Sequence, residues 1–253
     1  MNKFALITGA TAGFGEACAH TFAKENWNLI VTGRRKERLD ELKTNLEQTY
    51  NCSVHTLCFD VRSATEVENA IKSIPKEITD KLELLINNAG LAVGKGPIDE
   101  GIIEDWERMI DTNIKGLLYV SKEIIPFFKQ KKSGQIINIG SIAGKEVYPG
   151  GNVYCASKHA VDALSKAMRI DLVHHGVKVT NIAPGAADTE FSLVRFKGNQ
   201  ETAKSVYEGF SPLVANDIAE TALFVATRPG HVNINDIVIM PTAQASSTVL
   251  HKD

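Results

Sequence analysis

The stretch FALITGATAGFG, residues Phe4–Gly15, joins a short apolar run to a glycine-rich turn and then enters a helical pattern. The apolar run suits a strand that is buried on both faces, and the glycines fall where this strand turns into a helix. Glycine allows a tight turn and a close approach of the backbone to a phosphate, whose charge is met by free amide groups at the helix N-terminus. The stretch therefore predicts a nucleotide-binding βαβ unit, although a merely structural glycine turn is the alternative.

The alternation of short apolar runs with longer amphipathic segments continues along the chain. Strands are expected at Phe4–Thr8, Asn28–Thr32, Val54–Phe59, Leu82–Ile86, Gln135–Ile139, Val177–Ile182 and Asp236–Met240. Helices are expected at Phe14–Asn26, Lys36–Tyr50, Ala64–Ile74, Glu104–Gln130, Val153–His175 and Asp217–Thr227. The pattern predicts one α/β domain over residues 1–253, a Rossmann-type doubly wound parallel sheet of about seven strands with helices on both faces. Residues 186–211 lack a clear pattern, and we expect them to form a substrate lid.

The composition is that of an ordinary globular protein, with 43% hydrophobic and 23% charged residues. The net charge of −2 favours neither nucleic acid nor an anionic membrane as a partner. Four cysteines, Cys18, Cys52, Cys58 and Cys155, have neither C-x-x-C spacing nor a histidine cluster beside them, so no metal site is predicted. The first residues lack the apolar region of a signal peptide, and we expect a cytoplasmic protein.

The glycine-rich turn and the second strand supply the first candidates for cofactor binding. Arg34 and Arg35 stand where NAD-binding units usually carry a carboxylate for the ribose hydroxyls. Guanidinium groups can pair with the 2′-phosphate of NADP, so NADP is the expected cofactor, and two solvated arginines are the alternative. The candidates in the turn itself are Gly9, Ala10, Thr11, Gly13, Phe14 and Gly15.

Three more candidates follow the third and fourth predicted strands. Asp60 and Val61 come after the third strand, and Asn88 comes just beyond the fourth. Because the carboxyl ends of parallel strands meet at one edge of the sheet, these residues are placed to hold the adenine and its ribose. Asp60 by itself would equally suit a helix cap or a turn.

Tyr154 and Lys158 lie four residues apart on a predicted helix, so their side chains share one face. An ammonium group near a phenol favours the phenolate and brings its pKa towards neutral, which suits a general acid or base. Ser141 follows the fifth strand at the ligand-binding edge, where its hydroxyl can bond a reacting oxygen. Asn113 is a poor helix former inside a predicted helix, which suggests another task such as holding a water molecule. Taken singly, each could be a surface pair, a turn serine or a tolerated asparagine.

In sequence and spacing, these motifs resemble those of the short-chain dehydrogenase/reductase family, and the resemblance covers essentially the whole chain. The resemblance implies that Tyr154 is the proton donor or acceptor, that Lys158 binds the nicotinamide ribose and lowers the tyrosine pKa, and that Ser141 orients the substrate oxygen. It also implies a proton-relay role for Asn113 and a nicotinamide contact for Pro184, Gly185 and Thr189. The matching motifs are Thr8-Gly-x-x-x-Gly13-x-Gly15, Asn87-Asn88-Ala89-Gly90, Asn113, Ser141, Tyr154-x-x-x-Lys158 and Pro184-Gly185-x-x-x-Thr189.

Within that family, the chain looks like the NADP-dependent 3-hydroxy acid dehydrogenases. Members of this group oxidise L-allo-threonine, serine or 3-hydroxyisobutyrate, or reduce malonic semialdehyde, and family members are usually homotetramers or dimers; a homotetramer is expected here. In the predicted lid, Arg195 could pair with a substrate carboxylate. The alternative is that Arg195 belongs to a solvated basic loop with no contact to the substrate. A carbonyl reductase of uncharged ketones, diketones or sugars is the second hypothesis, and a non-catalytic NADP-binding regulator is the third.

Overall fold

The computed structural model describes residues 3–253 and shows a fully parallel main sheet. Within these residues seven strands pair in the order β3-β2-β1-β4-β5-β6-β9. Their bounds are β1 (Phe4–Ile7), β2 (Asn28–Gly33), β3 (Val54–Cys58), β4 (Leu82–Asn87), β5 (Gly134–Ile139), β6 (Val177–Pro184) and β9 (Asp236–Ile239). The chain leaves β1 in one direction across the sheet and returns to β4 on its other side, so the carboxyl ends of β1 and β4 flank a crevice.

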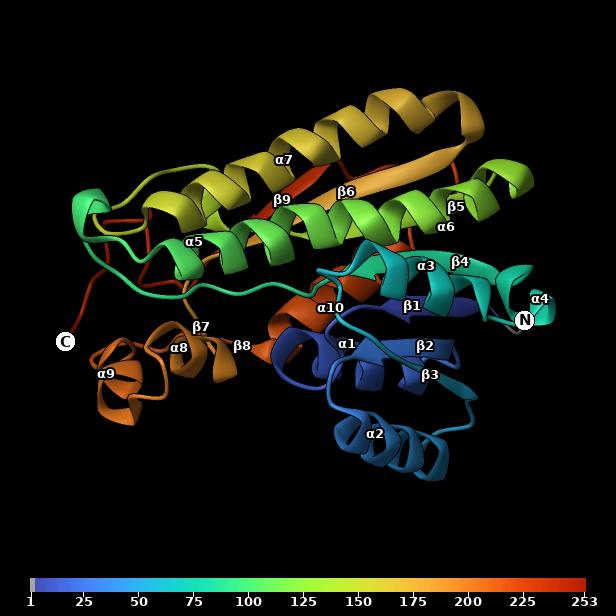
Figure 1. Cartoon of the computed structure of the whole chain (residues 1–253), viewed down its shortest axis with the longest axis horizontal. Helices are drawn as coiled ribbons and strands as arrows, with labels where there is room; N and C mark the ends of the chain where they lie inside the picture. The colour runs from blue at the N-terminus through green and yellow to red at the C-terminus, as the bar shows by residue number, and fades with distance from the viewer. Residues whose placement is uncertain (1–2) are drawn as a thin grey trace.

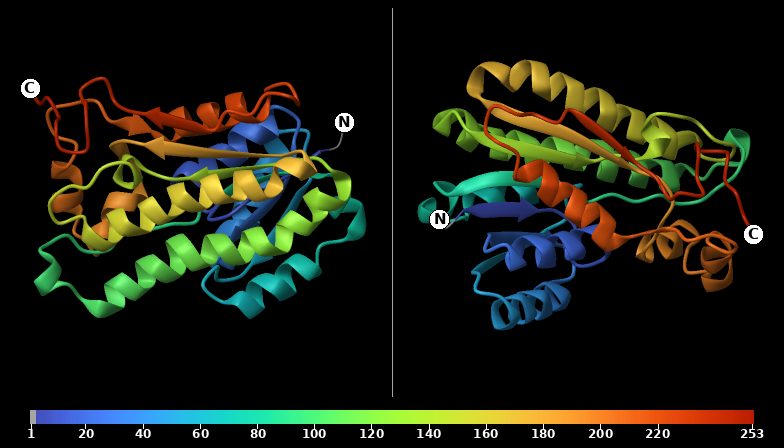
Figure 2. Two further views of the ribbon diagram at one scale, coloured as in Figure 1. Left: turned by 90° about the horizontal axis from the view of Figure 1, so that it is seen from above. Right: turned by 180° about the vertical axis from the view of Figure 1, so that it is seen from behind.

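Helices cover both faces of this sheet, as predicted (Figure 1; Figure 2). One face is packed by α1 (Gly13–Lys24), α2 (Lys36–Thr49) and α10 (Ala215–Ala226). The other is packed by α3 (Ala64–Lys72), α6 (Leu117–Lys131) and α7 (Asn152–Leu172). The expected Rossmann-type α/β fold is thereby confirmed.

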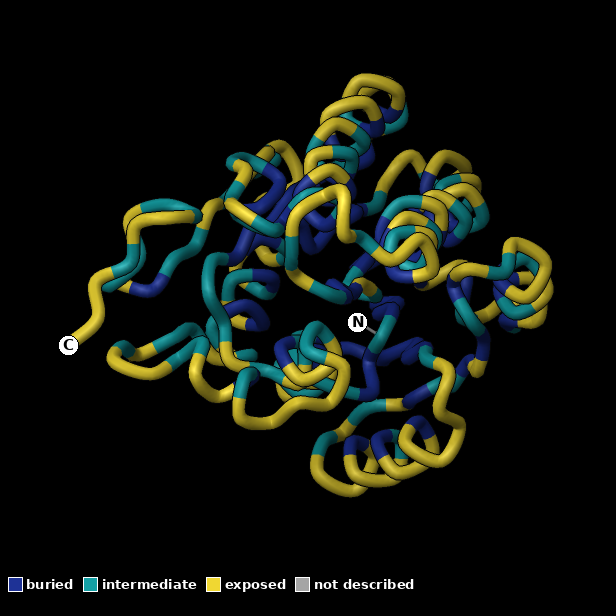
Figure 3. Tube along the Cα trace, turned by 60° about the vertical axis from the view of Figure 1, so that its left-hand side comes forward, coloured by how far each residue is buried: buried dark blue, intermediate teal, exposed yellow. Residues whose placement is uncertain are grey.

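Strand β1 is apolar throughout because helices cover both faces of the sheet at this strand. Ala5 and Ile7 pack into the cluster under α1, α2 and α10, whereas Phe4 and Leu6 pack into the cluster under α6 and α7. All four side chains are buried because successive residues of a strand point to opposite faces, and both faces are covered. Figure 3 shows the result, with buried segments along the inside and exposed turns of the helices outside.

The long helix expected at Glu104–Gln130 is interrupted. It consists of α5 (Ile103–Ile110), a wider π-helical turn η2 (Asp111–Gly116) and then α6. Such π turns inside helices often occur at functional sites, and this one carries Asn113. The spacing of apolar residues does not reveal the π turn, because the chain is helical on both sides of it.

The expected lid also has more structure than its sequence suggests. It contains β7 (Ala187–Asp188), which pairs in parallel with β8 (Leu213–Val214), and the helices α8 (Glu190–Arg195) and α9 (Gln200–Ser205). Both helices are six residues long, too short to produce a recognisable apolar period. In Figure 1 they lie at the end of the molecule where the C-terminus also lies. Further short helical elements are α4 (Lys76–Thr79), η1 (Ile98–Glu100), η3 (Ile142–Gly144) and η4 (Val173–His175).

Candidate active site

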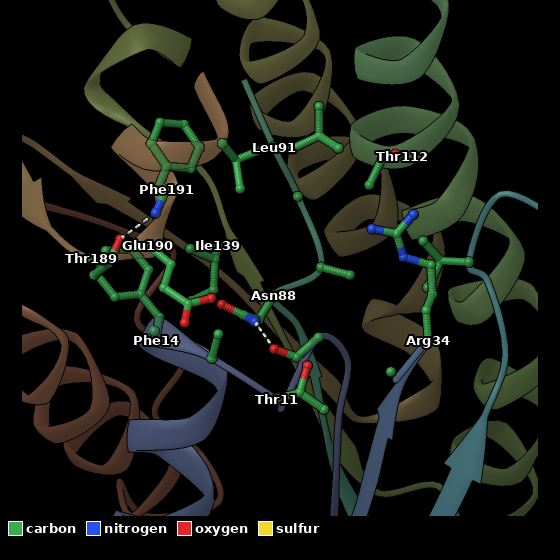
Figure 4. Close-up of a pocket in the computed structure, with 18 of the residues that line it drawn as sticks. Thr11, Phe14, Arg34, Asn88, Leu91, Thr112, Ile139, Thr189, Glu190 and Phe191 are labelled. Carbon is green, nitrogen blue, oxygen red and sulfur yellow. Dashed lines mark hydrogen bonds between the residues drawn. The ribbon is translucent and has the colours of Figure 1, made fainter. Parts of the chain in front are cut away.

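A cavity of about 330 Å³ opens at the carboxyl ends of β1 and β4, and we call it the crevice pocket. Figure 4 shows Thr11 and Asn88 low in this pocket, Arg34 on one side and Phe191 on the other. Strands and helix starts from distant parts of the sequence therefore meet here, as the topology requires. The predicted site residues that line it are Gly9, Thr11, Gly13, Phe14, Arg34, Arg35, Asp60, Val61, Asn88, Tyr154, Lys158 and Thr189.

The glycine-rich turn is shaped by close backbone contacts. A Cβ atom on Gly15 would lie 2.3 Å from the carbonyl oxygen of Gly9 and 2.5 Å from Nδ2 of Asn88. That Nδ2 donates to the carbonyl oxygens of Thr8, at 2.8 Å, and Gly9, at 3.2 Å. Asn88 thus fixes the turn in place, and Gly15 lets α1 begin against it. Ala10 is fully buried, and its N–H donates to the Thr32 carbonyl oxygen.

The two arginines after β2 take up different positions. Arg35 Nη2 donates to Thr11 Oγ1 at 2.9 Å, which ties it to the glycine-rich turn. Arg34 is more exposed, and its Nη1 lies 3.6 Å from Asp60 Oδ2. Partial burial alone would raise the pKa of Asp60, but hydrogen bonds from Arg62 and the charge of Arg34 outweigh it, so this pKa lies below its usual value. The carboxylate is therefore held by arginines in this structure rather than free for a ribose.

Tyr154 is 8% exposed and Lys158 is 6% exposed, although both line the crevice pocket. Lys158 Nζ donates to the Ile139 carbonyl oxygen at 2.9 Å and lies 6.0 Å from the centroid of the tyrosine ring. Burial lowers the pKa of Lys158 to about 8 and raises the pKa of Tyr154 above its usual range. The nearby Ser141 hydroxyl and the charge of Arg195 oppose the rise in the pKa of Tyr154. Activation of the tyrosine by Lys158 stays a prediction.

A second cavity of about 380 Å³ is lined by residues of α8 and of the segment that follows α9, and we call it the lid pocket. Ser141, Pro184, Gly185 and Arg195 line it, and Tyr154 lines both this pocket and the crevice pocket. Ser141 Oγ accepts from the Ala143 N–H at 3.1 Å and lies 3.5 Å from the Pro184 carbonyl oxygen. The expected catalytic serine and tyrosine thus reach a common space from β5 and α7.

Asn113 is 2% exposed and uses its whole side chain in tertiary contacts. Its Oδ1 accepts from the Leu91 N–H at 2.8 Å, and its Nδ2 donates to the Leu91 carbonyl oxygen at 2.8 Å and to Ser157 Oγ at 3.0 Å. Ser157 Oγ in turn donates to the Tyr154 carbonyl oxygen at 2.8 Å. The π turn therefore links the segment after β4 to the helix that carries Tyr154, and the expected water-holding role stays a prediction.

Arg195 is the last residue of α8, and its guanidinium faces two tyrosines. Nη2 donates to the Tyr148 hydroxyl at 3.0 Å, and Cζ lies 5.8 Å from the centroid of the Tyr154 ring. Its Nε is buried and has no hydrogen-bond partner within residues 3–253. The guanidinium therefore stands beside the predicted catalytic tyrosine with hydrogen-bonding capacity to spare.

The scan of family models matches residues 3–199 to the short chain dehydrogenase family. The chain belongs to this family. It is an oxidoreductase, and the resemblance noted in the sequence is confirmed. All the family motifs quoted above fall inside the matched region.

Two curated relatives align with this short-chain dehydrogenase along nearly its whole length. Sulfoacetaldehyde reductase 2 of Chromohalobacter salexigens is 46% identical over 248 residues, which cover 98% of this chain and 97% of the relative. The NADP-dependent 3-hydroxy acid dehydrogenase YdfG of Salmonella typhi is 46% identical over 241 residues, which cover 95% of each. A solved closed form of serine dehydrogenase complexed with NADP⁺ superposes with a TM-score of 0.91 at 43% identity, covering 99% of this chain and 100% of that structure.

Several residues of the site escaped the sequence analysis. Phe191 packs on Tyr154 with ring centroids 5.6 Å apart and lines both pockets. Tyr148 bonds Arg195, and Glu190 lines the crevice pocket from the lid. Aromatic and acidic residues in a short helix or a loop carry no local signal for such contacts. Within residues 3–253, no cluster of His, Cys, Asp and Glu could hold a metal ion. No helix in the same range is both long and apolar enough to cross a membrane.

Proposed function

We propose that this short-chain dehydrogenase uses NADP to move a hydride to or from C3 of a small 3-hydroxy acid or 3-oxo acid. The observation that carries the proposal is the position of Tyr154, which lines the crevice pocket and the lid pocket at once. A proton donor at this junction touches both the space for the nicotinamide and the space for the substrate. The relatives named for 3-hydroxy acid and serine dehydrogenation support the same class of reaction.

The residues of the crevice pocket fit NADP. Gly15 lets the glycine-rich turn close against the start of α1, and Gly9, Thr11 and Gly13 of this turn line the crevice pocket, as suits a pyrophosphate at a helix N-terminus. Arg34 and Arg35 offer two guanidinium groups to a 2′-phosphate, at the position after β2 where NAD-binding units usually carry a carboxylate. Lys158 and Asn88 line the pocket between the turn and Tyr154. When bound, NADP supplies or accepts the hydride.

The side chains around Tyr154 share the remaining tasks. In the reductive direction the carbonyl carbon gains the hydride, and the carbonyl oxygen gains the proton from Tyr154 Oη. Ser141 holds the substrate oxygen beside that hydroxyl. Asn113 keeps the Tyr154 helix in register through Ser157. Arg195 binds the acid group and so sets C3 towards Tyr154.

The first test is kinetic. Tyr154→Phe should lower kcat by about 100-fold or more with NADP and L-allo-threonine, because the acid/base group is removed. NADPH binding, measured by fluorescence, should change little. Wild-type kcat in this variant would refute the proposed role.

The second test separates an acid substrate from an uncharged one. Arg195→Ala should lower kcat/KM for serine by about tenfold or more, because a charge-assisted hydrogen bond is lost, and should spare an uncharged diketone. An equal loss for both would favour a general carbonyl reductase. Tight NADPH binding without turnover of any small carbonyl would favour a regulator.

The proposal extends to the lid, the assembly and the compartment. Residues 186–211 close over the substrate, since α8 carries Arg195 and Phe191 into the lid pocket. A homotetramer, which the resemblance to the family implies, is tested by light scattering. A cytoplasmic location is tested by cell fractionation.

A further inference from the structure

The lid pocket contains two cationic side chains, Lys95 and Arg195, and no carboxylate among its lining residues within 3–253. The crevice pocket differs, because Asp60 and Glu190 line it together with the arginines. A concave site with two cations and no acid attracts an anionic ligand. Arg195 already has a task in the proposed function, whereas Lys95 has none.

The loop that carries Lys95 is fixed on three sides. The Gly94 N–H donates to the Arg195 carbonyl oxygen at 3.0 Å, which joins this loop directly to α8. Asn152 Nδ2 donates to the Gly96 carbonyl oxygen at 3.1 Å, which joins it to the start of the Tyr154 helix. Gly150, with φ +74°, brings its backbone so close that a Cβ there would lie 3.1 Å from Cγ of Lys95. The stem of Lys95 therefore has a defined place, and its position is coupled to that of Arg195.

Lys95 also differs from the other cation of this region. Lys197 Nζ lies 2.7 Å from Asp105 Oδ2, so its charge is already compensated. Lys95 is exposed at the rim of the lid pocket, also lines a smaller neighbouring cavity that contains Glu100 and Asp105, and has no ion pair or side-chain hydrogen bond within residues 3–253. Arg195 has one nitrogen committed to the Tyr148 hydroxyl. The cationic group left without a partner beside the substrate space is thus Lys95.

We propose that Lys95 is a specificity-determining residue that selects a tetrahedral acid group with three oxygens, as in a sulfonate or phosphonate, over a planar carboxylate. The inference rests on the proposed function, in which Arg195 binds the acid group next to the reacting carbon. A carboxylate has two oxygens, and one guanidinium can engage both. A third oxygen lies outside that plane and needs a donor from another direction, which Lys95 provides from the loop beside α8.

The test compares Lys95→Met with the wild-type enzyme on four aldehydes of matched length. Methionine keeps the unbranched stem against Gly150 and removes only the charge. For sulfoacetaldehyde, kcat/KM should fall by about tenfold, the value of one charge-assisted hydrogen bond. For malonic semialdehyde it should fall by less than about threefold, and for propanal, which has no acid group, it should not change. For phosphonoacetaldehyde, kcat/KM should fall at least as much as for sulfoacetaldehyde, because its acid group also carries three oxygens.

Two controls accompany the variant. Lys204→Met makes the same chemical change on α9, where the side chain is exposed and lines neither pocket. This variant should leave kcat/KM unchanged for all four aldehydes. Lys95→Arg should recover most of the sulfoacetaldehyde activity. Equal losses for the sulfonate and the carboxylate, or no loss for either, would overturn the proposal. Absence of turnover of every aldehyde by the wild-type enzyme would instead refute the proposed function.

Discussion

The carboxylate of Glu190 accepts hydrogen bonds from Nη1 of Arg38, at 3.3 Å and 3.4 Å to its two oxygens. Glu190 begins α8 in the lid, and Arg38 lies in the first turns of α2, so the contact joins residues that are 152 positions apart. The same carboxylate lies 3.9 Å from Nη1 of Arg35. These contacts join α8, in the proposed lid, to α2, which follows the predicted 2′-phosphate site.

Glu190→Gln tests these contacts. All three side chains are about half exposed, so the ion pairs are worth only about 0.2–1 kcal/mol. NADPH should therefore dissociate about two- to fivefold faster in stopped-flow fluorescence, because the lid opens more easily. Glu201→Gln in α9 is the control, since Glu201 forms no ion pair within residues 3–253. Slower dissociation would show instead that Glu190 repels the coenzyme phosphate.

Lys158→Met tests the charge state of the buried lysine through stability. Burial lowers the pKa of Lys158 from 10.5 to about 8, so the unfolded chain binds the proton more tightly than the folded one. The resulting penalty on folding is complete below about pH 8 and fades as the pH rises towards about 10.5.

The free energy of unfolding of the wild type, relative to Lys158→Met, should therefore rise by about 2 kcal/mol between about pH 7 and about pH 9.5. Urea unfolding at several pH values measures this difference. A difference that stays constant over the range would show that Lys158 keeps an ordinary pKa in the folded enzyme. The variant should also lose activity, which turnover assays check separately.

Gly15→Ala should damage both the fold and coenzyme binding. The new methyl group would meet the Gly9 carbonyl oxygen and Nδ2 of Asn88, and neither can move without opening the turn. We expect a loss of about 1–3 kcal/mol in stability, typical of overpacking, together with weaker NADPH binding. Gly230→Ala is a matched control, because its Cβ would meet no atom within 4 Å. Unchanged melting temperature and coenzyme affinity in Gly15→Ala would contradict the close packing.

Asn113→Ala removes three hydrogen bonds in a buried place. The N–H and the carbonyl group of Leu91 are left without this partner, whereas the Ser157 hydroxyl keeps its hydrogen bond to the Tyr154 carbonyl oxygen. Each of the two orphaned buried groups costs about 1–3 kcal/mol, so the free energy of unfolding should fall by about 2–6 kcal/mol. Asn69→Ala, on the exposed side of α3, should change it by less than about 0.5 kcal/mol. A small effect at Asn113 would mean that the π turn is held mainly by packing.

Much of the site could be predicted because its signals are local or repeat at a fixed spacing. The glycines of Phe4–Gly15 identified a strand-to-helix turn, and parallel strands bring their carboxyl ends to one edge whatever the loops do. Arg34, Asp60 and Asn88 therefore line one pocket at the carboxyl edge of the sheet, as the topology predicts. Tyr154 and Lys158 could be paired since four residues on a helix return to the same face.

The contacts around the lid pocket depend on tertiary structure alone. The sequence by itself determined the parallel sheet, the coenzyme edge and the residues along it, because strand and helix periods are properties of neighbouring residues. Only the folded chain decided that Arg195 faces Tyr148, that Glu190 meets Arg38 and that Lys95 lines the lid pocket. Two six-residue helices and an exposed loop leave no period in the sequence. Their partners are chosen by the packing of segments that are remote along the chain.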